Sequence, residues 1–230
     1  MLFREEDENL EALPFADRTE AGRILAGRLS TYSSRSDVVL LGLPRGGVPV
    51  ASAVAGALHL PLDVLVVRKL GTPEEPELAM GAVAHGGVQV LDLSLVKAFQ
   101  VSDAYVQEIT AKGWSEVEKL ERLYRGGRPP LELKAKTVIL VDDGIATGCS
   151  ILAAIASIRR KGAVRVVVAA PVAAISSGSA IRMEADKFIT VAEPEMFLAV
   201  SQWYLNFSQV SDEDVQRLLR GAEDSMPRAA

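Results

Sequence analysis

Two adjacent aspartates, Asp142 and Asp143, stand where an apolar run ends and a loop of small residues and hydroxyls begins. The surrounding stretch, residues 138–150, reads VILVDDGIATGCS. Neighbouring carboxylates repel each other, and burying them is costly unless a partner compensates their charge. We therefore expect a ligand from outside the chain to supply donors to this pair, and hydroxyl groups suit that role.

The loop that follows the aspartates has the features of an anion site. If a strand precedes it and a helix follows, the backbone amides of residues 146–150 lie at a helix N-terminus, which favours anions. Glycines allow the backbone to fold tightly, and hydroxyls add donors. The residues expected to hold a phosphate are Ala146, Thr147, Gly148, Cys149 and Ser150. The lysine and spacing of a nucleoside triphosphate loop are absent, and so is a GxGxxG pattern. A phosphate beside a diol is a sugar phosphate, and ribose 5-phosphate fits these two sets of donors and acceptors.

A second loop of the same kind lies earlier in the chain. Residues 42–51 read GLPRGGVPVA, where Arg45, Gly46 and Gly47 connect a predicted strand to a predicted helix. Arg68 and Lys69 follow another predicted strand. Ligands of open parallel sheets gather at the carboxyl ends of strands, so these basic residues should lie at the same sheet edge. The alternatives are an ordinary tight turn for the first group and a solvated charge pair for the second.

Short apolar runs alternate with helical patterns along most of the chain. Strands are predicted at 38–43, 62–67, 137–141, 164–170 and 188–191, and helices at 15–29, 48–60 and 150–160. Strands that are apolar throughout and alternate with helices indicate a parallel sheet covered on both faces. Residues 78–93 predict an antiparallel ribbon that turns at His85–Gly87, and residues 102–124 predict a long amphipathic helix. A capping box at Ser211 predicts a last helix.

Composition restricts the class of protein. The 230 residues carry a net charge of -5 with basic residues scattered, which gives no footprint for nucleic acid. No apolar run approaches the roughly 20 residues that span a bilayer, and the acidic start lacks the order of a secretory signal. A single cysteine, Cys149, excludes an intramolecular disulfide. We expect a soluble cytoplasmic protein.

The stretch over 138–150 closely resembles the phosphoribosyl pyrophosphate motif of the type I phosphoribosyltransferases. This resemblance implies that Asp142 and Asp143 hold the ribose hydroxyls and that residues 146–150 bind the 5′-phosphate. The loop with Arg45, Gly46 and Gly47 resembles the family's pyrophosphate loop, in which a strained peptide bond often turns an amide toward the ligand. Arg68 and Lys69 match the basic residues before the family's flexible loop, here residues 71–87. The implied fold is a doubly wound, mostly parallel α/β sheet with an antiparallel ribbon and helical insertion and a small C-terminal hood.

The resemblance also implies a base site. In the family a C-terminal hood stacks on the nucleobase, and residues 194–207 resemble it, with Phe197, Trp203 and Tyr204 as stacking candidates. The competing interpretation is that these aromatic residues pack the tail onto the core. Relatives that use oxopurines carry an acid where this chain has Ala146, whereas adenine-type relatives carry alanine. A purine acceptor is therefore expected rather than a pyrimidine.

The implied reaction transfers the phosphoribosyl group of phosphoribosyl pyrophosphate to a nitrogenous base and releases pyrophosphate, with Mg²⁺ held mainly by ligand oxygens and water. Two alternatives remain open: a regulator that binds the same ligand or a nucleotide without catalysis, and a phosphoribosyl pyrophosphate synthetase relative, which the absence of an internal repeat disfavours. We expect one domain, with a core over 15–192, an insertion over 71–130 and the hood and tail over 193–230. The helix at 102–124 would cover the site or form a homodimer contact.

Overall fold

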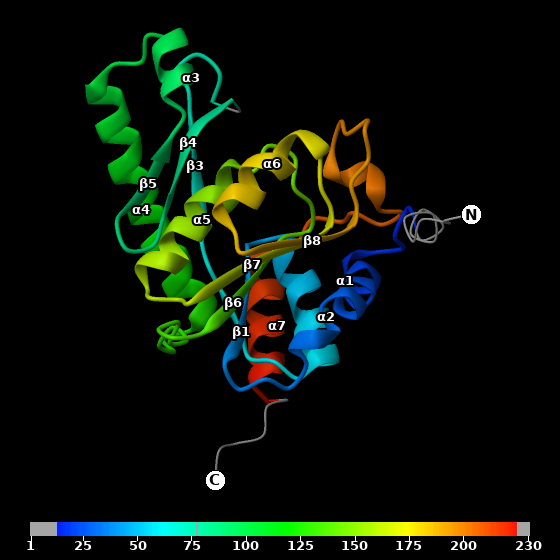
Figure 1. Ribbon diagram of the computed structural model, residues 1–230. Coiled ribbons are helices and arrows are strands. Elements are labelled where there is room, and N and C mark those ends of the chain that lie inside the picture. The colour runs from blue at the N-terminus through cyan, green and yellow to red at the C-terminus, as the bar shows by residue number, and fades with distance from the viewer. Residues whose placement is uncertain (1–12, 77, 225–230) are drawn as a thin grey trace.

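Five parallel strands form the central sheet of the computed structural model, which describes residues 13–76 and 78–224 (Figure 1). The acidic first ten residues and Glu77 of the predicted loop lie outside the described residues. The strands are β1 (Val38–Gly42), β2 (Leu62–Val64), β6 (Thr137–Val141), β7 (Arg165–Val172) and β8 (Lys187–Ala192), in the order β2-β1-β6-β7-β8. Gly42 pairs with Val141, so β1 and β6 end together and their following loops start at one sheet edge. The predicted doubly wound, mostly parallel α/β fold is confirmed.

Helices cover both faces of this sheet because successive strand residues point to opposite sides. On one face, α1 (Arg18–Arg28) and α2 (Gly47–Leu58) pack against Leu40, Ile139 and Val167. On the other, α5 (Cys149–Arg160) and α6 (Ile175–Glu184) pack against the alternate residues, among them Leu41, Leu140 and Val168. Both sets of strand residues are buried, which explains why the sequence of each strand is apolar throughout.

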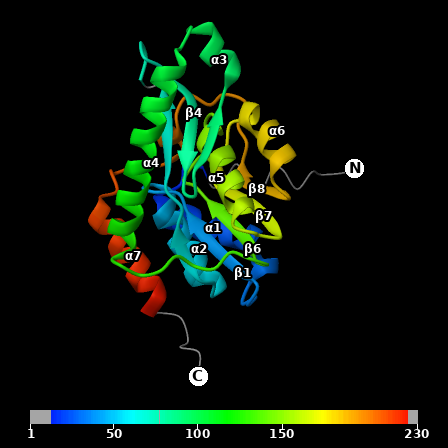
Figure 2. The same ribbon diagram turned by 90° about the vertical axis from the view of Figure 1, so that its left-hand side faces the viewer.

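A smaller antiparallel sheet stands beside the core. It contains β3 (Val67–Gly71), β4 (Ala79–Ala84) and β5 (Val88–Leu91) in that order, and β4 and β5 form the predicted ribbon. The helices α3 (Leu93–Ala98) and α4 (Asp103–Arg125) follow, and the long α4 runs along this sheet (Figure 2). Ser102 caps α4 by accepting a hydrogen bond from the Tyr105 amide at 3.2 Å. The long helix predicted over 102–124 is confirmed.

The prediction of one strand over 62–67 is wrong. The chain leaves the parallel sheet after Val64 and enters the antiparallel sheet at Val67. The Val64 carbonyl accepts a hydrogen bond from Arg125 at 2.8 Å instead of extending the ladder. Arg68 and Lys69 consequently lie within β3, not after a strand of the main sheet. Sequence periodicity did not separate these two strands because residues 64–67 form an unbroken apolar run, VLVV, across the two-residue gap between them.

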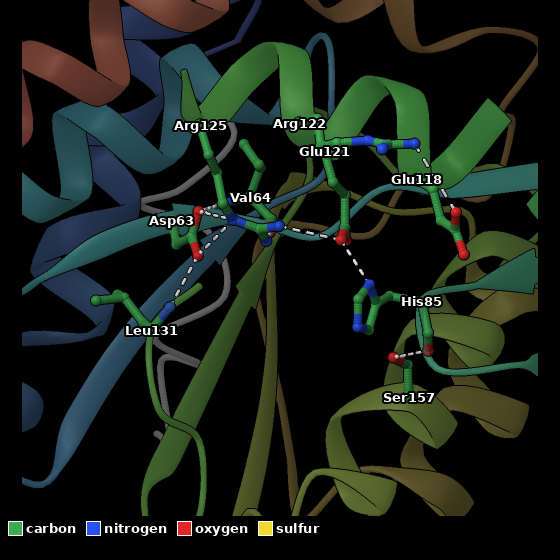
Figure 3. A network of polar contacts seen from close by, with 9 residues as sticks. All are labelled: Asp63, Val64, His85, Glu118, Glu121, Arg122, Arg125, Leu131 and Ser157. Atoms are coloured by element: carbon green, nitrogen blue, oxygen red, sulfur yellow. Dashed lines mark hydrogen bonds and ion pairs between the residues drawn. The ribbon is translucent and has the colours of Figure 1, made fainter. Parts of the chain in front are cut away.

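A buried polar network fastens the antiparallel sheet and α4 to the core (Figure 3). The Arg125 Nε lies 3.0 Å from both oxygens of Asp63 on β2, and its Nη1 lies 3.0 Å from Glu121. Glu121 also pairs with His85 Nδ1 at 2.6 Å, and Ser157 donates to the His85 carbonyl at 2.9 Å. Since Asp63, Glu121 and Arg125 are buried, each needs the others to offset its desolvation.

The C-terminal part of the chain returns to the N-terminal segment. Residues 193–210, called the hood from here on, include the 3₁₀ turn η3 (Val200–Trp203), and Tyr204 forms a β-bridge with Phe15. The last helix, α7 (Asp212–Asp224), packs between α2 and α4 through Val215 and Leu219. Ser211 and Asp214 exchange the hydrogen bonds of the predicted capping box. A further 3₁₀ turn, η2 (Ser30–Tyr32), follows α1.

In the described part of the chain, no helix has the length and apolarity needed to cross a membrane.

Candidate active site

The two aspartates stand at the carboxyl end of β6, in the middle of the parallel sheet. Asp142 is partly exposed, and its Oδ1 accepts the backbone N–H of Asp143 at 2.9 Å. Burial raises the pKa of Asp142 well above its usual range, and the adjacent charge of Asp143 raises it further, while Lys69 opposes the shift. The protein thus disfavours the charged form of Asp142, whereas Asp143 has a cationic partner that is described below.

The loop after β1 lies directly against this pair. A methyl group on Gly46 would lie 1.9 Å from Asp143 Oδ2, and one on Gly47 would lie 2.8 Å from the Asp142 Cα. The Leu43 amide donates to the Val141 carbonyl at 2.9 Å, which fixes the start of this loop against the end of β6. The peptide bond between Pro44 and Arg45 is cis. The two glycine loops predicted to share a sheet edge therefore meet at the acid pair.

The loop after β6 connects the strand to α5 through a glycine turn, the local structure on which the predicted phosphate site depends. Gly148 has a φ of 76°, a conformation that favours glycine, and α5 begins at the next residue. Ile145 is held by a β-bridge to Ala173, and the Ser177 hydroxyl donates to the Ala146 carbonyl. Ala146 and Thr147 are exposed. The first backbone N–H groups of α5 have no acceptor within the helix, so this turn presents donors beside Asp142 and Asp143.

Cys149, the first residue of α5, packs against Ala82, Ala84 and Val88 of the antiparallel sheet. Burial raises the pKa of its thiol, although Lys69 acts in the opposite direction. A thiol with a raised pKa holds little thiolate at neutral pH and is a poor nucleophile. Because a thiol is also a weak hydrogen-bond donor, Cys149 would contact a phosphate through its backbone N–H.

The three predicted basic residues do not all face the acid pair. Lys69 is exposed and electrostatically coupled to Asp142 and Cys149, whereas its strand neighbour Arg68 points to the opposite face of β3. There Arg68 Nε lies 3.2 Å from Glu116 of α4. Arg45 is also exposed, and its Nη1 lies 3.8 Å from Asp212 at the start of α7. Without ligand, Lys69 is thus the basic residue of this group whose charge acts on the acid pair.

Arg18 is the partner of Asp143, and the sequence analysis missed it. The Arg18 Nε donates to Asp143 Oδ2 at 2.7 Å, and the Arg18 side chain is 10% exposed. A signal for this residue existed: Arg18 lies three and seven positions before Ala21 and Leu25, which places it on the buried face of α1. A buried arginine needs an acid, but the acid is 125 positions away and no local pattern identifies it.

Comparison with known proteins decides the family. A family model described as "Phosphoribosyl transferase domain" matches residues 16–208. This chain belongs to the phosphoribosyl transferase family. The match includes both glycine loops, the acid pair and most of the hood, as the resemblance of residues 138–150 implied.

Two curated relatives from Mycobacterium tuberculosis strains carry the names "Putative phosphoribosyl transferase MT0597" and "Putative phosphoribosyl transferase Rv0571c". Each is 43% identical over 215 residues, which is 94% of this chain and 48% of the relative. The chain thus spans about half the length of the curated relatives it matches. The crystal structure of TT1426 from Thermus thermophilus is 41% identical, has a TM-score of 0.75, and covers 89% of this chain and 97% of its own.

The hood of this phosphoribosyl transferase domain covers the acid pair from one side. A methyl group on Gly144 would lie 2.4 Å from Val200 of the hood, so the hood rests directly on the loop after β6. The Tyr204 hydroxyl donates to the Asp143 carbonyl at 2.5 Å. The Tyr204 ring is buried and contacts Phe15 and Phe207 at centroid distances of 5.5 and 5.2 Å.

This burial conflicts with the expectation that Tyr204 stacks on a base, because both its ring and its hydroxyl serve packing. The other two candidates differ. Phe197 and Trp203 are partly exposed and stack on each other with centroids 6.2 Å apart. They remain the aromatic residues of the hood that could meet a base.

Proposed function

We propose that this domain transfers a phosphoribosyl group from phosphoribosyl pyrophosphate to a nitrogenous base and releases pyrophosphate. The meeting of two glycine-rich loops at an acid pair carries this proposal, since it sets a phosphate cradle, a pyrophosphate loop and diol acceptors side by side. Membership in the family supports the same reaction.

In this proposal each part of the ligand has its own contact. The ribose hydroxyls donate to Asp142 and Asp143, which replaces the water that buried carboxylates lose. The amides of residues 146–150 and the hydroxyls of Thr147 and Ser150 bind the 5′-phosphate. The backbone around Gly46 and Gly47, together with Arg45, Arg68 and Lys69, binds the pyrophosphate, Lys69 most directly.

A base nitrogen attacks the anomeric carbon while the bond from that carbon to the pyrophosphate oxygen breaks. The bonding electron pair leaves with pyrophosphate, and the proton displaced from the base passes to solvent or to the departing pyrophosphate. Positive charge develops on the ribose ring, and in this proposal the two carboxylates stabilise it. The basic side chains offset the charge of the leaving group. The hood excludes water, which would otherwise compete with the base.

The proposed reaction uses a magnesium ion that arrives with the substrate. Within residues 13–76 and 78–224, no group of three or more histidine, cysteine or acidic side chains is placed to hold a metal. Mg²⁺ prefers oxygen ligands and keeps several waters, so pyrophosphate and ribose oxygens would hold it beside Asp142. When bound, the ion neutralises charge on the pyrophosphate.

The proposed acceptor is a purine. Ala146 lies in the loop at the position where an acid would serve an oxopurine, which favours an adenine-like base. Phe197 and Trp203 would supply stacking surfaces, and base–aromatic stacking is worth about 1–3 kcal/mol per base.

The test is pyrophosphate release from phosphoribosyl pyrophosphate and Mg²⁺, with purine bases, with pyrimidine bases and without a base. Release that requires a purine supports the proposal. Ligand binding without release under any condition would favour the regulator instead, and release that requires only pyrimidines would refute the purine assignment.

A further inference from the structure

Arg18 links three segments that lie far apart in the sequence. From α1, its Nε donates to Asp143 Oδ2 at 2.7 Å and its Nη1 donates to the Ser208 carbonyl of the hood at 2.8 Å. The guanidinium carbon lies 3.8 Å from the centroid of the Phe207 ring. A buried guanidinium is tolerated only where its donors are satisfied, and here the acid and the hood satisfy them together.

The hood is held to the same place by backbone contacts. The Leu205 and Asn206 amides donate to the carbonyls of Phe15 and Ala16 at 2.7 and 3.0 Å, immediately before α1. The Tyr204 hydroxyl donates to the Asp143 carbonyl. The position of the hood, the N-terminal segment and the second acid are therefore fixed by contacts that all lie around Arg18.

Asp143 is also confined on its far side. Asp143 Oδ2, the oxygen that accepts the Arg18 hydrogen bond, lies so close to Gly46 that no side chain larger than hydrogen fits at that position. The carboxylate is thus clamped between Arg18 and the pyrophosphate loop. If the hood left, the Arg18 side chain would lose the Ser208 carbonyl and the Phe207 ring that hold it in place. Asp143 would then lose the fixed cation that compensates its charge beside Asp142.

We propose that Arg18 is a positioning residue that couples the seating of the hood to the acid pair, so that a seated hood and a bound ribose phosphate favour each other. This inference rests on the proposed function, because the acid pair is taken to hold ribose. The coupling is reciprocal. If a seated hood raises the affinity for ribose phosphate by a given factor, bound ribose phosphate raises the equilibrium constant for hood seating by the same factor.

The experiment compares Arg18→Met, Arg18→Lys and Phe207→Leu with the wild type by two measurements. Phe207→Leu removes the hood's ring contact without leaving a buried acid unpaired, so it covers the case in which Arg18→Met fails to fold. Hydrogen exchange of the Leu205 and Asn206 amides without ligand reports hood seating. Calorimetry with ribose 5-phosphate reports affinity as Kd. Because a reversibly unfolded fraction raises the apparent Kd, each variant is first shown by urea unfolding to be fully folded under the conditions of the titration.

Arg35→Met is the matched control. Arg35 forms an ion pair with Asp37 at 2.7 Å and lies over the Tyr32 ring at 5.8 Å, but this pair is exposed and far from the hood in the sequence. We expect faster exchange and about tenfold weaker binding in Arg18→Met and Phe207→Leu. Arg18→Lys should restore part of the loss, and Arg35→Met should match the wild type.

Two results would overturn the proposal: wild-type exchange in both Arg18→Met and Phe207→Leu, or faster exchange with an unchanged Kd. An absence of ribose 5-phosphate binding by the wild type would refute the proposed function instead. In that case the exchange rates alone decide whether Arg18 seats the hood.

Discussion

Gly46 and Asp143 are in such close contact that a methyl group on Gly46 would overlap the Asp143 carboxylate, with 1.9 Å between the added carbon and Oδ2. This contact joins the loop after β1 to the acid pair after β6. It explains why glycine stands at this position: the carboxylate occupies the space that a side chain would need.

Gly46→Ala tests this contact. We expect a loss of about 1–3 kcal/mol in the free energy of unfolding, as overpacking at a tight site costs, together with weaker binding of ribose 5-phosphate. The matched control is Gly56→Ala in α2, where an added methyl meets nothing within 4 Å. That change should stabilise the protein by about 0.5–1 kcal/mol. Equal urea midpoints for the two variants would show that the Gly46 contact is not as tight as described.

Asp142→Asn should make the protein more stable at high pH. The folded state raises the pKa of Asp142 through burial and through Asp143. Because the folded protein then binds more protons than the unfolded chain, the wild type loses stability as pH rises from the ordinary aspartate pKa, about 3.9, through the raised value. The variant lacks this loss, so its Tm should exceed that of the wild type at pH 8, and the difference should shrink toward pH 4. A variant with the lower Tm at pH 8 would show that Asp142 is not destabilised by its surroundings.

Lys69 and Arg68 allow a comparison within one strand. Lys69 acts on Asp142, whereas Arg68 pairs with Glu116 on α4. Lys69→Met should weaken pyrophosphate binding about tenfold, the value of one lost contact to a charged group, and Arg68→Met should weaken it less. Calorimetry with pyrophosphate and Mg²⁺ measures both. A larger loss in Arg68→Met would mean that the ligand draws Arg68 away from Glu116.

The network of Figure 3 predicts unequal costs for two arginines of α4. Arg125→Met leaves Asp63 and Glu121 buried without their shared cation and should cost about 3–5 kcal/mol. Arg122 pairs with Glu118 at 3.9 Å on the exposed face, so Arg122→Met should cost about 0–1 kcal/mol. Urea unfolding with an unchanged m-value provides both numbers. Similar costs would contradict the role given to the buried network.

Local patterns in the sequence were sufficient for the sheet, for the covering helices α1, α2 and α5, for the long helix α4 and for both glycine loops, whereas α6 was not predicted. Each of the predicted elements depends on residues close together in the chain. The division between β2 and β3 was missed because Val64 ends its ladder through Arg125, which is 61 positions later. Arg18 was missed for the same reason, since its partner Asp143 is 125 positions away. For Tyr204 the sequence left base stacking and core packing open, because its partner Asp143 is 61 positions away.

The measurement that tests the central claim most directly is calorimetry of ribose 5-phosphate binding to the wild type, Asp142→Asn and Arg35→Met, each shown to be folded by circular dichroism. We predict saturable binding with one site per chain in the wild type and in Arg35→Met. Affinity should fall at least about tenfold in Asp142→Asn, because the ribose hydroxyls lose a charged acceptor. Equal affinity in all three proteins would contradict the assignment of the acid pair to the ribose.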